Sequence, residues 1–196
     1  IQVVPHITDE IKRNIKLLGQ KYHYDFVITE IGGTIGDIES APFLEAIRQM
    51  KWELGKRAIN LHLTYVPYLN AAGEFKTKPT QHSVKELQSV GIQPDVLVLR
   101  TEKHLDDDIR KKVAAFCNVD FDCVVQSEDL PSIYDVPINM LNQGLDEAIL
   151  RKCGEQIGDK PALGPWREFL DRQRKATKEV HIGLVGKYDL QDAYKS

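Results

Sequence analysis

The sequence is short of cysteine, of long apolar runs and of excess basic charge, and each shortage excludes a class of protein. Its three cysteines form no Cys-x-x-Cys pair. We therefore expect neither a disulfide framework nor a structural zinc site, and a cytoplasmic location. No apolar run approaches the roughly 18–20 residues of a membrane span. The 26 basic and 29 acidic residues give a formal net charge of -3, which disfavours nucleic acid as a partner.

The remaining composition is that of a folded domain. The 196 residues are 42% hydrophobic and 28% charged, which is enough for a core and too apolar for a disordered chain. The first residues lack a basic segment followed by a long apolar one, so we expect no signal peptide. The chain begins with Ile1 and ends at Ser196 in a pattern typical of a starting helix. We expect it to be a piece of a longer protein.

Segments with helical periodicity alternate with segments typical of strands. Helices are expected over residues 8–19, 40–54, 83–91 and 105–116, and strands over residues 25–31, 59–65, 95–99 and 123–125. This alternation predicts an α/β fold with a mostly parallel sheet flanked by helices. Ligands of such folds bind at the carboxyl ends of the strands, which directs attention to Glu30, Asp37, Arg100 and the loop after Tyr65.

The pattern changes beyond residue 132. Apolar residues at helical spacing predict one helix face that contains Ile138, Leu141, Leu145 and Ile149. Residues 154–165 are rich in glycine and proline and are typical of a connector, and residues 180–186 predict the first strand of a new domain. We therefore expect a first domain over residues 1–153, a linker with a helix over 154–179, and a truncated second domain over 180–196.

The first segment that could carry chemistry is the glycine-rich stretch 30–40. Glu30 stands at an expected strand end, three glycines follow, and then come Asp37 and Glu39. Glycines let backbone N–H groups approach a phosphate, and a carboxylate at a strand end can hold Mg²⁺ beside phosphates. The pattern alone favours an ordinary glycine turn with solvated acids. It is not a Walker A loop, because no Gly-Lys-Ser/Thr follows.

The second segment is a basic loop at residues 73–81. Lys76 and Lys78 stand two residues apart in an extended stretch and therefore project to the same side, just before a helix whose free N–H groups can bind an anion. This arrangement suits a triphosphate, although an exposed basic loop is the commoner explanation. A third basic group, residues 110–112, is typical of a solvated helix face. His62 and His82 are candidate bases that are more simply structural or surface residues.

Two of these segments resemble the signature sequences of CTP synthases. They are Glu-Ile-Gly-Gly-Thr-Ile-Gly-Asp-Ile-Glu-Ser at 30–40 and Lys-Thr-Lys-Pro-Thr-Gln-His-Ser-Val-Lys-Glu-Leu at 76–87, and shorter matches lie at 4–8, 42–49, 91–95 and 116–119. The resemblance runs over nearly the whole chain in the same order. It implies the central and C-terminal part of a P-loop, dethiobiotin-synthetase-like amidoligase domain, followed by the first residues of a glutamine amidotransferase domain.

The resemblance also implies a reaction. CTP synthases use ATP and Mg²⁺ to phosphorylate the 4-oxygen of UTP, ammonia derived from glutamine displaces the phosphate, and the product CTP inhibits. The family is tetrameric, so a homotetramer is expected. Its P-loop would precede Ile1 and its glutaminase triad would follow Ser196. We therefore expect this chain alone to complete neither half reaction.

The family's functional positions can be carried onto residues that match its motifs. The resemblance implies Glu30 as a Mg²⁺ ligand, and Asp37, Ile38 and Glu39 as contacts of inhibitory CTP. It implies a loop shared by UTP and CTP, and one further lysine at that nucleotide: Lys76, Thr77, Lys78, Pro79, Thr80, Gln81 and Lys112. It implies ATP contacts at Glu128, Asp129 and Leu130, where the acidic Glu128 departs from the basic residue common in the family.

Two other functions remain open at this point. A non-catalytic nucleotide-binding or assembly module would keep the pocket and lose the chemistry. Another ATP-dependent ligase of the dethiobiotin synthetase type would share the sheet, but the Lys-Thr-Lys-Pro-Thr-Gln loop disfavours it.

Overall fold

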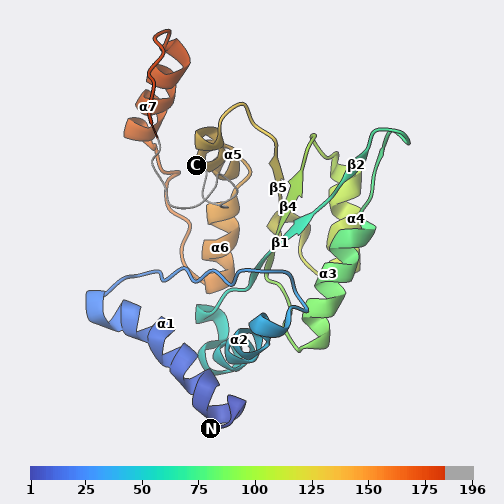
Figure 1. The fold of residues 1–196 in the computed structure, drawn as a ribbon, viewed down its shortest axis with the longest axis vertical. Coiled ribbons are helices and arrows are strands. Elements are labelled where there is room, and N and C mark those ends of the chain that lie inside the picture. The colour runs from blue at the N-terminus through green and yellow to red at the C-terminus, as the bar shows by residue number, and fades with distance from the viewer. Residues whose placement is uncertain (184–196) are drawn as a thin grey trace. The chain divides into compact units, whose positions relative to one another are not determined.

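The computed structural model describes residues 1–183 and contains a parallel sheet of three strands (Figure 1). The strands are β1 (Leu61–Tyr65), β4 (Val96–Thr101) and β5 (Val124–Glu128), in the order β1-β4-β5. Leu61 lies opposite Val96, and Leu97 lies opposite Val124. The predicted α/β fold with a parallel sheet flanked by helices is confirmed. A short antiparallel hairpin, β2 (Tyr68–Leu69) with β3 (Glu74–Phe75), follows β1 and was not predicted.

Helices cover both sides of the sheet. α3 (Lys78–Ser89) contacts β1 and α4 (Asp107–Cys117) contacts β5, and Figure 1 shows both on the same side. α5 (Val136–Asn142) contacts β5 and packs on α6 (Leu145–Cys153). α1 (Thr8–Tyr22) packs on α2 (Ala41–Leu54). None of the helices in the described residues is long and apolar enough to cross a membrane.

The core lies between the sheet and the helices α3 and α4. Leu97, Leu99 and Val113 are fully buried there, together with Val84 of α3. Burying each such side chain stabilises the fold by about 1.5–3 kcal/mol. β4 is the central strand, which explains why its sequence Val-Leu-Val-Leu is apolar on both faces, as in sheets covered on two sides.

Two compact units divide the chain, residues 1–159 and residues 160–196. All the strands among residues 1–183 belong to the first unit. The second contains α7 (Gly164–Lys175), within which the rings of Trp166 and Phe169 lie 5.6 Å apart. Of the strand expected at 180–186, residues 180–183 are not a strand, and residues 184–186 lie outside the described part of the chain.

The strand predicted over residues 25–31 is wrong. This segment is irregular, with Phe26 54% and Ile28 94% exposed. Its composition favours a strand, but a strand forms only where a neighbour supplies hydrogen bonds, and no described segment pairs with it. Sequence propensity was therefore overridden by the lack of a partner.

The single helix face predicted from Ile138 to Ile149 is interrupted. α5 ends at Asn142 and α6 begins at Leu145, because Gly144 adopts a positive φ of 75° between them. Two further predicted boundaries were displaced. α1 runs past Gly19 to Tyr22, and α3 starts at Lys78, five positions before the predicted Ser83.

Candidate functional site

The first turn of α3 divides the predicted Lys76–Gln81 segment into buried and exposed side chains. Thr77, Thr80 and Gln81 are buried, and Gln81 Nε2 donates to Thr77 Oγ1 at 3.0 Å. These three side chains hold the loop together and point away from solvent. Lys78 and Pro79 are exposed and Lys76 is half-buried, so the two lysine side chains at the start of α3 are what the loop offers a ligand. Pro79 has no N–H, and Thr80 is fully buried.

The lysines predicted from two different segments act on the hairpin and on the facing helix α4. Lys76 Nζ donates to Glu74 Oε1 at 2.5 Å, and Lys78 Nζ lies 6.0 Å from the ring centroid of Phe116 on α4. The pKa of Glu74 is lowered, first by the hydrogen bond and charge of Lys76 and then by the charge of Lys112. The packing of α3 on α4 thus places Lys112 within electrostatic range of the lysine loop. We call Lys76, Lys78 and Lys112 the lysine cluster.

Polar side chains gather at the carboxyl ends of the three strands. Tyr65 donates to Glu102 at 2.7 Å, and this hydrogen bond raises the pKa of the Tyr65 hydroxyl. Arg100 forms an ion pair with Asp129 and donates to the carbonyl of Ser127 at 3.1 Å. The rule that ligands bind at the carboxyl ends of strands predicted Arg100 and the loop after Tyr65 as parts of a binding site. The prediction missed Glu102, which stands directly after β4 and could have been found by the same rule.

The segment Glu128–Leu130 begins at the carboxyl end of β5. Glu128 is half-buried, and its carboxylate lies 3.4 Å from His104 Nδ1. The backbone N–H of Asp129 donates to the Thr101 carbonyl at 3.1 Å. This contact and the Arg100 ion pair fix residues 128–130 at the same sheet edge as the end of β4.

The glycine-rich segment folds into a closed turn around Asp37. Asp37 Oδ2 accepts from the Thr34 N–H at 2.7 Å, and the Asp37 N–H donates to the Thr34 carbonyl at 3.0 Å. Gly33 has a φ of +85°, and a Cβ there would lie 2.6 Å from Asp37 Oδ2, so only glycine fits. The carboxylate of Asp37 is therefore held by its own turn, whereas Ile38 and Glu39 are exposed.

Glu30 lines a hollow to which none of the three cluster lysines contributes. It is exposed and lines an open hollow of about 240 Å³ whose other lining residues come from α1, α2 and the preceding Thr29. Glu10 in the same hollow is held by Arg13 and Asn14, which lower its pKa to about 2. Glu30 makes no hydrogen bond or ion pair within residues 1–183. Its free carboxylate fits Mg²⁺, which takes one or two carboxylates together with waters and substrate phosphates.

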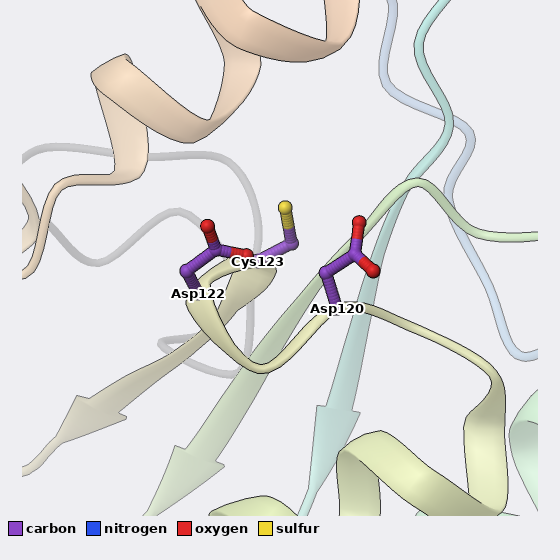
Figure 2. A group of neighbouring side chains, drawn as sticks. All are labelled: Asp120, Asp122 and Cys123. Carbon is purple, nitrogen blue, oxygen red and sulfur yellow. The ribbon is translucent and has the colours of Figure 1, made fainter.

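A second group of possible metal ligands is neutralised by cations instead. Asp120, Asp122 and Cys123 lie close together at the start of β5 (Figure 2). Asp120 pairs with Lys152 and Asp122 with Arg151, both at 2.6 Å, and Arg151 also donates to the Cys123 sulfur at 3.8 Å. Burial raises the pKa of the Cys123 thiol. The group therefore fastens the start of β5 to α6 through ion pairs.

His62 is a structural histidine. Its Nε2 lies 2.8 Å from Ser83 Oγ, and burial lowers the pKa of the imidazole. A neutral ring hydrogen-bonded to a serine joins β1 to α3. His82 is exposed on α3. These positions fit the simpler interpretation of His62 as a structural residue and His82 as a surface residue.

A family model and individual relatives both match this chain to CTP synthases. The family model described as CTP synthase N-terminus matches residues 1–154. Proteins named CTP synthase match the whole chain: 72% identical over 198 residues in Bacteroides thetaiotaomicron, 67% over 197 in Porphyromonas gingivalis, and 59% over 198 in Christiangramia forsetii. The chain spans 37%, 36% and 36% of the lengths of these three relatives.

The family match shows the family of the chain and the residues that belong to the matched region. It assigns residues 1–154 to the N-terminal region of the family. It does not reach the rest of the predicted linker or residues 180–196, where we expected the start of a glutaminase domain. We predicted the central and C-terminal part of the synthetase domain, whereas the description of the matching model names the N-terminus of the family. Both comparisons cover more than half of the chain, and on that basis it belongs to the CTP synthase family.

Proposed function

We propose that the complete protein containing this chain aminates UTP to CTP, using ATP and ammonia derived from glutamine, through a 4-phosphoryl-UTP intermediate. The observation that carries the proposal is the lysine cluster beside the N-terminus of α3. Three ammonium groups and a helix N-terminus form a site for one highly charged anion such as a nucleoside triphosphate. The global charge of -3 shows that this basic character is local.

The triphosphate of UTP would lie against Lys76, Lys78 and Lys112, and inhibitory CTP would share these contacts. Thr77, Thr80 and Gln81 would contribute through the backbone and through the shape of the turn, because their side chains are engaged inside the protein. The exposed Ile38 and Glu39 remain available for the base and sugar of CTP, with Asp37 fixing the turn that carries them.

ATP and Mg²⁺ would use the other two predicted groups. Glu30 would hold Mg²⁺, which when bound supplies charge neutralisation at the transferring phosphate. Residues Glu128, Asp129 and Leu130 would contact ATP at the carboxyl end of β5. Phosphoryl transfer depends chiefly on positioning and charge compensation, so no covalent nucleophile is required of these residues.

The remaining expectations belong to the same proposal. Residues 1–153 would form the central and C-terminal part of the synthetase domain, 154–179 the linker, and 180–196 the start of the glutaminase domain. The chain alone would be inactive. The complete protein would act in the cytoplasm as a homotetramer.

The experiment compares lysine variants in the complete protein. Lys112→Ala and Lys76→Ala are expected to raise the KM for UTP about tenfold or more in CTP formation with added ammonia, because charge-assisted contacts to phosphate are lost. Lys111→Ala is the matched control, since Lys111 neighbours Lys112 on α4 but lies near Asp108 and Phe121.

Three outcomes separate the candidate functions. CTP formation that weakens in the two cluster variants and not in the control supports the proposal. Calorimetric binding of CTP by a wild-type protein that forms no CTP would instead favour a non-catalytic nucleotide-binding module. A wild-type protein that neither binds nor forms CTP would overturn the proposal.

A further inference from the structure

Two hydrogen-bonded side-chain pairs join α3 to β1. Thr80 on the first turn of α3 meets Thr64, and Ser83, three positions further along the helix, meets His62. Both pairs bridge the same two elements. They differ in their distance along the chain from the lysines: Thr80 follows Lys78 by two residues, whereas Ser83 lies about one turn further along the helix.

The Thr64 pair is the more buried of the two. Thr80 is fully buried and Thr64 is 6% exposed. The two hydroxyl oxygens lie 3.0 Å apart, and Thr80 Oγ1 also lies 3.1 Å from the carbonyl oxygen of Tyr65. A carbonyl can only accept, so both contacts form together when Thr80 donates to Tyr65 and accepts from Thr64. The Thr64 hydroxyl thus sets the direction in which Thr80 donates.

This arrangement ties the start of α3 to the outer edge of the sheet. The N–H of Val66 donates to the carbonyl of Arg100 on β4 at 2.9 Å. Successive residues of a parallel ladder direct their backbone groups to opposite sides, so the carbonyl of Tyr65 faces away from β4. Thr80 satisfies that carbonyl. The first turn of α3 is consequently fixed to a backbone group, and Lys76 and Lys78 are fixed with it through Thr77 and Gln81.

We propose that Thr64 is a positioning residue for the triphosphate site, an inference that rests on the proposed function. Its hydroxyl touches no ligand. It holds Thr80, and through Thr80 the first turn of α3. This turn carries Lys78, follows Lys76 along the chain and belongs to the helix that packs on α4, which carries Lys112. Preorganised sites of this kind lose affinity when a supporting hydrogen bond is removed, even though every contacting group remains.

The test uses the complete protein with Thr64→Val, which keeps the shape of the side chain and removes its hydroxyl. The KM for UTP and the inhibition constant of CTP are expected to rise together by about fivefold, the effect of one lost hydrogen bond. The kcat at saturating UTP and the KM for ATP are expected to stay within about twofold. Thr64→Ser, which retains the hydroxyl, is expected to restore wild-type values.

Ser83→Ala is the matched control, because it breaks the other pair between the same elements. It is expected to lower the thermal unfolding midpoint as much as Thr64→Val does, while the KM for UTP stays within about twofold. Equal changes of KM in Thr64→Val and Ser83→Ala would mean that Thr64 serves stability alone and would overturn the inference.

Folding of the variants is checked by circular dichroism, and Thr64→Cys, with its weak donor, is a second variant of similar size. If Thr64→Val and Thr64→Cys both unfold while Thr64→Ser folds, the hydroxyl supports the fold and the inference is wrong. If the wild-type enzyme aminates UTP and Thr64→Val has the same KM for UTP as wild type, the inference about Thr64 is wrong and the proposed function stands. A wild-type protein without this activity would reject the proposed function as well.

Discussion

The carboxylate of Glu74 accepts a hydrogen bond from the ammonium of Lys76 at 2.5 Å, within the lysine cluster proposed to bind a triphosphate. An anion that binds there has to compete with this carboxylate. Because the side chains of Lys76 and Glu74 are 44% and 54% exposed, water screens the ion pair and it contributes little free energy.

Replacing Glu74 by Gln is therefore expected to strengthen nucleotide binding. The affinity for CTP, measured by calorimetry on the complete protein, should rise by about two- to fivefold, since one competing charge is removed. Asp122→Asn removes the same charge before the amino end of β5, away from the cluster, and should leave the affinity unchanged. Weaker binding in Glu74→Gln would show that Glu74 orients Lys76 and does not compete with the ligand.

Glu30 is expected to be essential for the ATP-dependent step. Glu30→Gln should lower CTP formation from ATP, UTP and added ammonia about a hundredfold or more, as when a charge-stabilising group is lost. Raising the concentration of Mg²⁺ should recover part of the activity. Glu10→Gln, in the same hollow, should retain it because Glu10 is held by Arg13 and Asn14. Near-normal turnover in Glu30→Gln would refute the metal role.

His62 predicts a pH dependence of stability. Burial lowers the pKa of His62 in the folded state below its usual value of about 6.5. The unfolded chain therefore binds the proton first, and stability is lost as the pH falls from about 6.5 through the folded pKa. His62→Gln should flatten the dependence of the unfolding midpoint on pH between about 5 and 7. The exposed His82→Gln should keep the wild-type dependence, and equal curves for His62→Gln and wild type would contradict the prediction.

The group of Asp120, Asp122 and Cys123 is expected to behave as an ion-pair cluster. Asp122→Asn should change the free energy of unfolding by less than about 1 kcal/mol, as for other exposed ion pairs. Added Zn²⁺ or Mg²⁺ should shift the unfolding midpoint of wild type and variant equally. A metal-dependent stabilisation that disappears in Asp122→Asn would show that the carboxylates bind the ion.

Local sequence patterns predicted the elements whose partners lie within the described chain. Hydrophobic periodicity and helix-capping residues predicted the strands β1, β4 and β5 and the helices between them. The prediction succeeded because each element buries its apolar side against a neighbour that is present. Residues 25–31 have the same strand composition, but no strand in the described part of the chain pairs with them, and their own sequence does not show this. The break at Gly144 was missed because the apolar spacing continues across it, whereas the positive φ depends on the glycine alone.

For the site, the motifs supplied the residue types and the fold supplied their grouping. Lys112 joins the lysine loop only because α4 packs on α3. Glu74 and Thr64 had no signal in the sequence, since an exposed acid and a strand threonine are common. The burial of Thr77, Thr80 and Gln81 depends on α3 starting at Lys78, and the predicted start at Ser83 concealed it.

β1 is an edge strand of the sheet, and it exposes apolar side chains on the face that turns away from α3. Leu61, Leu63 and Tyr65 are 44%, 61% and 45% exposed, while the polar His62 and Thr64 face α3, and among the described residues no strand pairs with the outer edge of β1. An unpaired apolar edge is a template on which other polypeptides add strands and aggregate. The yield and solubility of this chain when produced by itself would therefore report on that edge and not on the quality of its core.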